Sequence, residues 1–209
     1  MAPYGYFPIL KTTDAELNGY REVDASVRKN ILPVFELTRS RRSSLNPDAN
    51  IWKRIEAIRE IVSASPFILD LTIETTLSNA QISEMLNIPA RGFERWTEFV
   101  KEVSSKGLNP IPAIHYNPNE LKDVRAQIRT LAREFANLAF RASPDDAIDY
   151  VDKILSELDA SRLILILDGG YLPPSKSSGD YSALFESSLN ALPSSISKCN
   201  TRRSRHPLS

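Results

Sequence analysis

The sequence predicts an α/β protein in which short buried strands alternate with amphipathic helices. Six apolar runs of strand length recur along the 209 residues, and the segments between them carry apolar residues at helical spacing. The runs show little polar alternation, which is typical of parallel strands covered on both faces. We therefore expect an incomplete (β/α)8 TIM-like barrel with about six βα units, and we keep an open parallel α/β sheet as the alternative.

The expected strands occupy residues 6–10, 31–37, 66–71, 110–116, 137–140 and 162–167. The chain has only 7 glycines, with neither a GxGxxG turn nor a P-loop, so the usual signs of a nucleotide-binding open sheet are missing and the barrel is favoured. A closed barrel of this type needs eight strands. We therefore expect a truncated barrel that is poorly stable alone, self-associates or is completed by another polypeptide.

The segment at residues 47–65 has the first clear helical pattern. Its apolar residues recur at spacings of four, three and four from Ile51 to Val62, while charged residues fill the opposite side. Asn46, directly before Pro47, predicts an N-cap followed by proline at the first helical position.

Three later segments also have one apolar face each, at residues 91–106, 118–135 and 144–158. Gly107 is expected to end the first of them, because glycine is common just after the last helical residue. Residues 72–89 interrupt the alternation and predict an extra helical turn or lid on the face where the strands end.

The charge balance limits the classes of partner. Lys+Arg and Asp+Glu both number 26, so the formal net charge is zero and a dedicated nucleic-acid binder is disfavoured. We expect one βα-repeat domain at residues 1–193, followed by a polar basic tail at residues 194–209 that is disordered or frame-shifted. Nucleic acid is expected to bind through this tail or not at all.

The cysteine content and the hydropathy of the chain indicate its cellular compartment. Cys199 is the only cysteine, which excludes an internal disulfide and fits a reducing environment. No apolar run approaches the roughly 20 residues that cross a bilayer. We therefore expect a cytoplasmic protein without membrane contact.

The most informative feature is an ionisable residue at the end of every expected strand. These residues are Lys11, Glu36, Asp70, His115, Arg141 and Asp168. In either architecture the carboxyl ends of the strands surround one crevice, so we expect at least three of these side chains to share a charged pocket. The alternative for each is a polar exit from the core or a structural ion pair.

The candidate catalytic residues are Lys11, Glu36, Asp70, His115 and Asp168. Lys11 suits a base or Schiff-base amine if its pKa is lowered, or alternatively an ion pair with Glu36. His115 is the only histidine before the tail, and it suits either a general acid or base or a hydrogen-bonded structural role. The acidic residues and His115 are ligand types for a divalent metal, but without HxH or HExxH spacing we predict no metal site.

The candidate ligand-binding residues surround the same strand ends. Arg141 suits a carboxylate or phosphate through its planar guanidinium. Gly169 and Gly170 either present backbone N–H groups to an anion or simply form a turn. Tyr116 and Tyr171 either line a pocket or pack in the core with the hydroxyl at the surface. The sequence identifies no cofactor.

Short motifs resemble a known family. They are YFPILK at residues 6–11, the nearby Glu16, ILPVFEL at residues 31–37, ILDGGY at residues 166–171 and NALP at residues 190–193. They are similar to the beta-protein family, named from a T-even bacteriophage protein and found in phages and bacteria. The resemblance implies a barrel-like fold, a phage-associated setting and a length well beyond this chain. It matches Lys11, Glu16 and Glu36 to recurring polar positions, which adds Glu16 to the ligand-binding candidates.

Three functions follow from these observations. A phage-associated or phage–host interaction protein, with a host or phage protein as partner, ranks first because no catalytic spacing is recognisable. The second is an enzyme that acts on a small anionic ligand, a phosphate or carboxylate, at the strand ends. The third is nucleic-acid binding through the basic tail.

Overall fold

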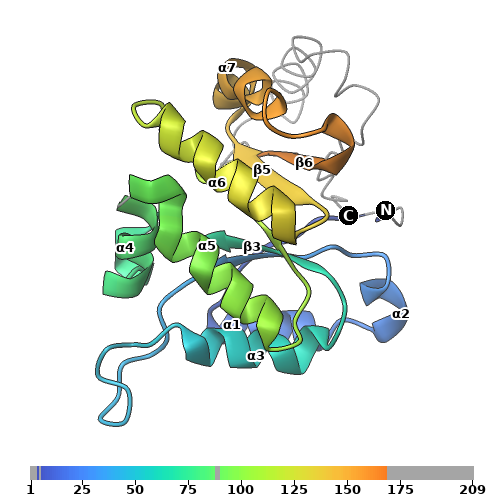
Figure 1. Cartoon of the computed structure of the whole chain (residues 1–209). Coiled ribbons are helices and arrows are strands. Elements are labelled where there is room, and N and C mark those ends of the chain that lie inside the picture. The colour runs from blue at the N-terminus through green and yellow to red at the C-terminus, as the bar shows by residue number, and fades with distance from the viewer. Residues whose placement is uncertain (1–3, 5, 88–89, 169–209) are drawn as a thin grey trace, which may run out of the picture.

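A computed structural model describes residue 4, residues 6–87 and residues 90–168 (Figure 1). The predictions for Gly169, Gly170, Tyr171 and the tail at residues 194–209 lie outside this part of the chain.

All six expected strands are present and parallel. They are β1 (Ile9–Lys11), β2 (Val34–Leu37), β3 (Phe67–Leu71), β4 (Pro110–Pro112), β5 (Leu138–Ala142) and β6 (Leu163–Leu167). The first four form a sheet in the order β1-β2-β3-β4, and β5 pairs with β6. A single parallel bridge between Ala113 and Ala139 continues from the β4 side to β5. The strands therefore neighbour one another in chain order.

The expected α/β class with a parallel sheet is confirmed, whereas a closed barrel is not shown. Among the described strands, β1 pairs only with β2, and β6 pairs only with β5. The arrangement is consistent with the alternative expectation, an open parallel α/β fold.

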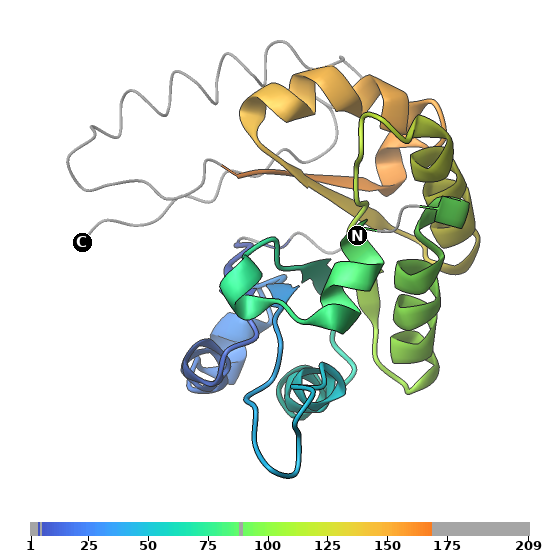
Figure 2. The same cartoon turned by 90° about the vertical axis from the view of Figure 1, so that its left-hand side faces the viewer.

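The helices lie along one side of the strands. They are α1 (Asp14–Arg21), α2 (Ala25–Arg28), α3 (Trp52–Val62), α4 (Ala80–Asn87), α5 (Ala90–Ser105), α6 (Leu121–Glu134) and α7 (Pro144–Leu155). Two short 3-10 turns, η1 (Thr75–Leu77) and η2 (Ala160–Arg162), precede α4 and β6. In Figure 2 the long helices form an arc around the strands. The four predicted helical segments are confirmed as α3, α5, α6 and α7, and the predicted extra turn or lid contains η1 and α4.

The predicted helix ends are partly confirmed. Gly107 follows α5 with a φ of 85°, a conformation that suits glycine, and its N–H donates to the Ser104 carbonyl at 2.9 Å. Asn46 was expected to cap a helix starting at Pro47, and this prediction is wrong, because α3 begins at Trp52. Asn46 is instead buried in the preceding loop, where its side-chain amide donates to Ser40 Oγ at 2.6 Å.

The two faces of the sheet contribute to different apolar clusters. Alternating strand residues such as Phe35 and Leu69 pack against the helices in the main core. The opposite residues form a smaller cluster of Leu32, Val34, Ile68, Ile111 and Ala139. Because side chains two positions apart share a face, Glu36, Asp70 and Arg141 follow Val34, Ile68 and Ala139 on this second face, at its carboxyl end.

Candidate functional site at the carboxyl ends of the strands

Three of the six predicted strand-end residues meet around a fourth, Arg141. Its Nη1 donates to Glu36 Oε2 at 2.7 Å and to Asp70 Oδ2 at 3.1 Å. Its Nε and Nη2 contact Asp168 Oδ2 at 2.8 Å and 2.7 Å. One guanidinium on β5 thus connects carboxylates from β2, from β3 and from the residue after β6. We refer to Glu36, Asp70, Arg141 and Asp168 as the strand-end cluster.

The strand register explains this convergence. Glu36 on β2 lies beside Asp70 on β3 in the parallel pairing, and Arg141 on β5 lies beside Ile166 on β6. Asp168 is two residues beyond Ile166, so it follows on the same face. The planar, five-donor shape of a guanidinium allows it to reach all three carboxylates.

The strand-end cluster is largely withdrawn from solvent and carries excess negative charge. Glu36 and Asp70 are only 3% and 7% exposed. Burial acts to lower the pKa of Arg141, but Asp70, Glu36 and Asp168 outweigh it and hold that pKa above its ordinary value. With its acids ionised, the cluster has three negative charges against one positive charge. Arg141 is therefore already engaged by these three carboxylates.

Lys11 lies outside the strand-end cluster. Its ammonium pairs with Glu74 in the segment after β3, rather than with Glu36 as the ion-pair alternative expected. Its backbone N–H donates to Glu16 Oε2 at 2.7 Å, so Glu16 adjoins it. The hydrogen bond that Lys11 donates to Glu74 raises the pKa of Lys11, burial opposes this, and the charges of Glu74, Glu36 and Glu16 add to the rise. This direction is opposite to the lowered pKa expected of a nucleophilic or basic amine.

His115 also lies outside the strand-end cluster, with its ring against aromatic side chains. The ring centroid is 4.8 Å from that of Trp96 and 6.3 Å from that of Phe93. Its backbone N–H donates to Gln127 Oε1 at 2.8 Å. Burial lowers the pKa of His115, and the charge of Asp70 opposes the effect. The imidazole is therefore held neutral near one member of the cluster.

Unpartnered polar atoms gather near His115. Its buried Nε2, the Gln127 Nε2 and the Tyr116 hydroxyl have no hydrogen-bond partner among the described residues. Tyr116 stacks on Tyr150 with ring centroids 4.0 Å apart, and burial raises the pKa of its hydroxyl. Its ring thus packs against the main core, which was the alternative to lining a pocket. Its hydroxyl is buried, whereas that alternative placed it at the surface.

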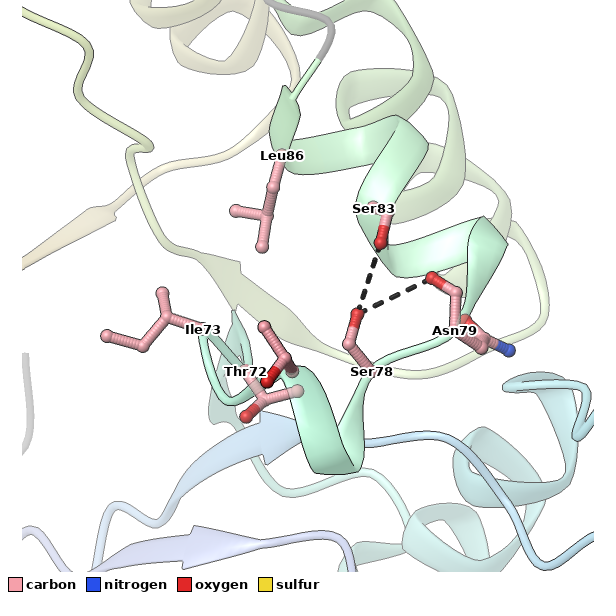
Figure 3. A pocket seen from close by; sticks show the side chains of 7 residues that line it. Thr72, Ile73, Ser78, Asn79, Ser83 and Leu86 are labelled. Carbon is pink, nitrogen blue, oxygen red and sulfur yellow. Dashed lines mark hydrogen bonds between the residues drawn. The ribbon is translucent and has the colours of Figure 1, made fainter.

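A hollow that sequence reasoning did not identify lies beyond the end of β3. Its volume is about 400 Å³, and Figure 3 shows its lining, which comes from the segment after β3 and from α4: Thr72, Ile73, Thr75, Ser78, Asn79, Ser83 and Leu86. The sequence signal was present as a concentration of hydroxyl residues within the predicted lid at 72–89. We refer to these seven residues as the hydroxyl pocket.

Comparison with known proteins identifies the family. A profile of the family described as Beta protein matches residues 6–202. The chain belongs to the Beta protein family. This family member is 29% identical over 192 residues to Protein beta of Enterobacteria phage P4. The match covers 90% of the chain and 50% of the relative, so the chain spans about half the relative's length. No solved structure matches it significantly.

Two further findings concern the described part of this Beta protein family member. Its described residues contain no group of three or more His, Cys, Asp or Glu side chains placed to hold a metal ion. Within the same residues, no helix combines the length and the apolar character needed to cross a membrane.

Proposed function

We propose that this Beta protein family member is a phage-associated interaction protein that recognises its partner through the strand-end cluster. The observation that supports this role is the convergence of Glu36, Asp70 and Asp168 on Arg141. Burying such charges is costly, and buried ion pairs add little net stability compared with apolar packing. A binding role therefore accounts for the cluster better than a packing role.

The strand order supports a barrel-like setting for this site. The six described strands follow one another in chain order, with the long helices along one side. A doubly wound sheet reverses its strand order at a switch point, whereas a TIM-like barrel does not. We propose that these strands are part of a TIM-like barrel, in which the carboxyl ends of the strands form the functional face.

The charge of the strand-end cluster indicates the chemistry of the partner. Three carboxylates surround one guanidinium, and Asp168 belongs to the less buried side of the group, with 26% of its side chain exposed. A lysine, arginine or amine of a host or phage protein would gain charge-assisted hydrogen bonds there. We therefore propose a protein partner that presents a basic side chain.

Affinity capture from a phage-host lysate tests this function. The full chain is compared with Asp168→Asn, which removes one accessible negative charge, and with Glu60→Gln, a matched change at an exposed carboxylate on α3. We expect specific partners on the wild-type and Glu60→Gln chains, with recovery from Asp168→Asn reduced about 10-fold or more. Equal recovery on all three chains would contradict the proposal.

The alternative is an enzyme that acts on a small phosphate or carboxylate ligand at the same face. The neutral imidazole of His115 near Asp70 favours this alternative, because it suits general base catalysis. An anion would have to displace a carboxylate from Arg141. Inorganic phosphate is therefore expected to raise the thermal midpoint if the enzyme alternative holds, and to leave it unchanged if the strand-end cluster binds cations.

Binding of nucleic acid through residues 194–209 stays a prediction. If it holds, the full chain is retained on a DNA or RNA column, its retention weakens as the salt concentration rises, and deletion of the tail abolishes it.

A further inference from the structure

We propose that the hydroxyl pocket binds a neutral, polyhydroxylated ring of monosaccharide size. The pocket shares no residue with the strand-end cluster, so it is a second site on the carboxyl-end face. Its volume of about 400 Å³ lies near the lower end of the range for small-molecule sites. That size suits one sugar ring better than an extended oligosaccharide.

The absence of ionisable side chains from the lining indicates a neutral ligand. All seven lining residues are uncharged. Glu74 lies in the same segment, but it pairs with Lys11 and is not part of the lining. A phosphate or carboxylate entering the pocket would lose hydration without meeting a counter-charge there, which is unfavourable.

The polar wall has hydrogen-bonding capacity for ligand hydroxyls. The Ser78 hydroxyl donates to the Asn79 carbonyl at 3.4 Å and lies 3.4 Å from the Ser83 hydroxyl, and both contacts are at the long limit for a hydrogen bond. Both hydroxyls therefore retain capacity to accept, and Ser83 retains capacity to donate. Asn79 plays a different part, because its amide donates to the Ala49 carbonyl at 3.0 Å and accepts from the Ile82 N–H at 3.1 Å. Asn79 thus holds the wall in place, and the serines face the ligand.

The apolar wall matches the other side of a sugar ring. Figure 3 shows Ile73 and Leu86 on one side of the hollow, with Ser78 and Ser83 on the other. Ile73 is 84% exposed, so its apolar side chain is open to contact from a ligand. The C–H face of a sugar would cover Ile73 and Leu86 while its hydroxyls bond to the serines.

Free sugars and nucleosides both present such a ring, so the test includes both. Saturation-transfer NMR of the full chain uses a panel of methyl glycosides and the four ribonucleosides, together with glucose 6-phosphate and the nucleoside 5′-monophosphates. We expect transfer to at least one neutral compound and a weaker signal from its phosphorylated counterpart. Transfer to glycosides alone indicates a saccharide ligand, and transfer to nucleosides indicates a ribose-bearing one.

Two pocket variants and two matched controls locate the binding. Ser83→Ala removes a hydroxyl and Ile73→Ala removes apolar contact, and each is expected to weaken binding about 3- to 10-fold. The controls are Ser44→Ala and Leu45→Ala, on the exposed loop that precedes α3, where Leu45 is 90% exposed. Because all four side chains lie outside the buried core, the variants are expected to keep the wild-type circular dichroism spectrum.

Three outcomes would overturn the inference: no transfer to any neutral compound, equal transfer to phosphorylated compounds, or unchanged binding in both pocket variants. Asp168→Asn separates this inference from the proposed function. We expect that variant to lose partner capture and to retain sugar binding, because Asp168 is not part of the pocket lining.

Discussion

Arg141 is the only cation of the strand-end cluster, and it pairs with all three carboxylates. Replacing it by methionine keeps most of the side-chain volume but leaves Glu36 and Asp70, 3% and 7% exposed, without their counter-charge. We expect Arg141→Met to lower the free energy of unfolding by about 3–5 kcal/mol, because it removes the positive partner and leaves buried carboxylates without compensation. Urea denaturation at neutral pH measures the change.

Arg129→Met is the matched control for that prediction. Arg129 also binds a carboxylate through two nitrogens, with contacts of 2.6 Å and 3.1 Å to Glu157, but its guanidinium is exposed to solvent. The Glu157 side chain is only 11% exposed, but Arg125 lies 3.7 Å from it and remains as a counter-charge when the exposed Arg129 is removed. The urea midpoint should therefore hardly move. Similar losses in the two variants would show that burial of the strand-end cluster is not what makes Arg141 important.

His115 is expected to make the stability of the fold depend on pH. Burial lowers its pKa in the folded chain below the ordinary value of 6.5, and Asp70 opposes the effect. The unfolded chain therefore binds the proton more readily, so the stabilising contribution is present above pH 6.5 and is lost as the pH falls toward the lowered pKa. His115→Phe keeps the ring beside Trp96 without a titrating group, and it should flatten the fall in unfolding free energy between about pH 7 and pH 5.

The other histidine of the chain supplies the control. His206→Gln removes a titrating group from the segment after residue 193 and should leave the pH profile of the wild-type chain unchanged. If His115→Phe keeps the full pH dependence of the unfolding free energy and His206→Gln loses it, His206 causes the dependence and the prediction for His115 is wrong.

At the scale of elements, the start of α5 is held by a close contact with α6. Arg91, Gly92 and Phe93 all have left-handed φ values of 59°, 73° and 55°, and the Gly92 N–H donates to Asp123 at 3.0 Å. A Cβ on Gly92 would lie 2.8 Å from Ala126 Cβ. Gly92→Ala is therefore expected to lower the free energy of unfolding by about 1–3 kcal/mol through backbone strain and overpacking.

Gly19 offers a contrasting glycine in the interior of α1. A Cβ there would meet no heavy atom within 4 Å. Gly19→Ala is expected to stabilise the chain by about 0.5–1 kcal/mol, because alanine loses less backbone entropy in a helix. Urea denaturation of both variants should give shifts of opposite sign, and a stabilising Gly92→Ala would disprove the close-contact argument.

The elements themselves were largely predictable because their periodicities are strong. Six short apolar runs and four amphipathic segments correspond to the observed strands and long helices. The start of α3 was not predictable from capping preference. Asn46 and Pro47 form a sound local signal, but the Asn46 amide binds Ser40 and the Arg41 carbonyl within the preceding loop. Hydrogen bonds within the loop outweighed the capping preference of Asn46.

At the scale of the whole molecule, the candidate site was predictable where it depends on strand pairing. Glu36, Asp70, Arg141 and Asp168 meet because parallel strands place their carboxyl ends on one edge, and polar residues at those ends can be read from the sequence. The partner of Lys11 was not predictable in this way. It is Glu74, in a connecting segment whose path no periodicity describes.

The hydroxyl pocket depends in the same way on a connecting segment. The segment at residues 72–89 was recognised as an insertion on the face where strands end. The path of η1 and α4 after β3 determines which of its side chains line the hollow. Contacts with other parts of the chain, such as that of the Asn79 amide with the Ala49 carbonyl, fix this path. The strands thus determine which side chains meet in the strand-end cluster, and the connecting segment determines which side chains line the hydroxyl pocket.

One main apolar core joins the two paired sets of strands. It contains residues of the four-stranded sheet, such as Phe35 and Leu69, together with Leu138 on β5 and Leu165 on β6. The direct connection between the two sets is narrow by comparison. Between their backbones it consists of the Ala113–Ala139 bridge, with the Ile114 N–H donating to the Ala139 carbonyl at 2.7 Å, and between their side chains it includes the contacts of Arg141 with Glu36 and Asp70. Cooperativity is therefore expected to come from the shared core rather than from the sheet hydrogen bonds.

A single unfolding transition is the expected consequence of that shared core. In a Trp52→Phe chain, which leaves Trp96 as the single tryptophan, fluorescence reports on the junction of β4 and β5, because the Trp96 Nε1 donates to the Ala113 carbonyl at 3.0 Å. Far-ultraviolet circular dichroism reports on all helices. The two signals should give the same urea midpoint, as two-state unfolding requires. Amide exchange in β6 should respond to urea as steeply as exchange in β3. A separate, earlier opening of β5 and β6 would instead show that these strands form their own unit, held only weakly to the four-stranded sheet.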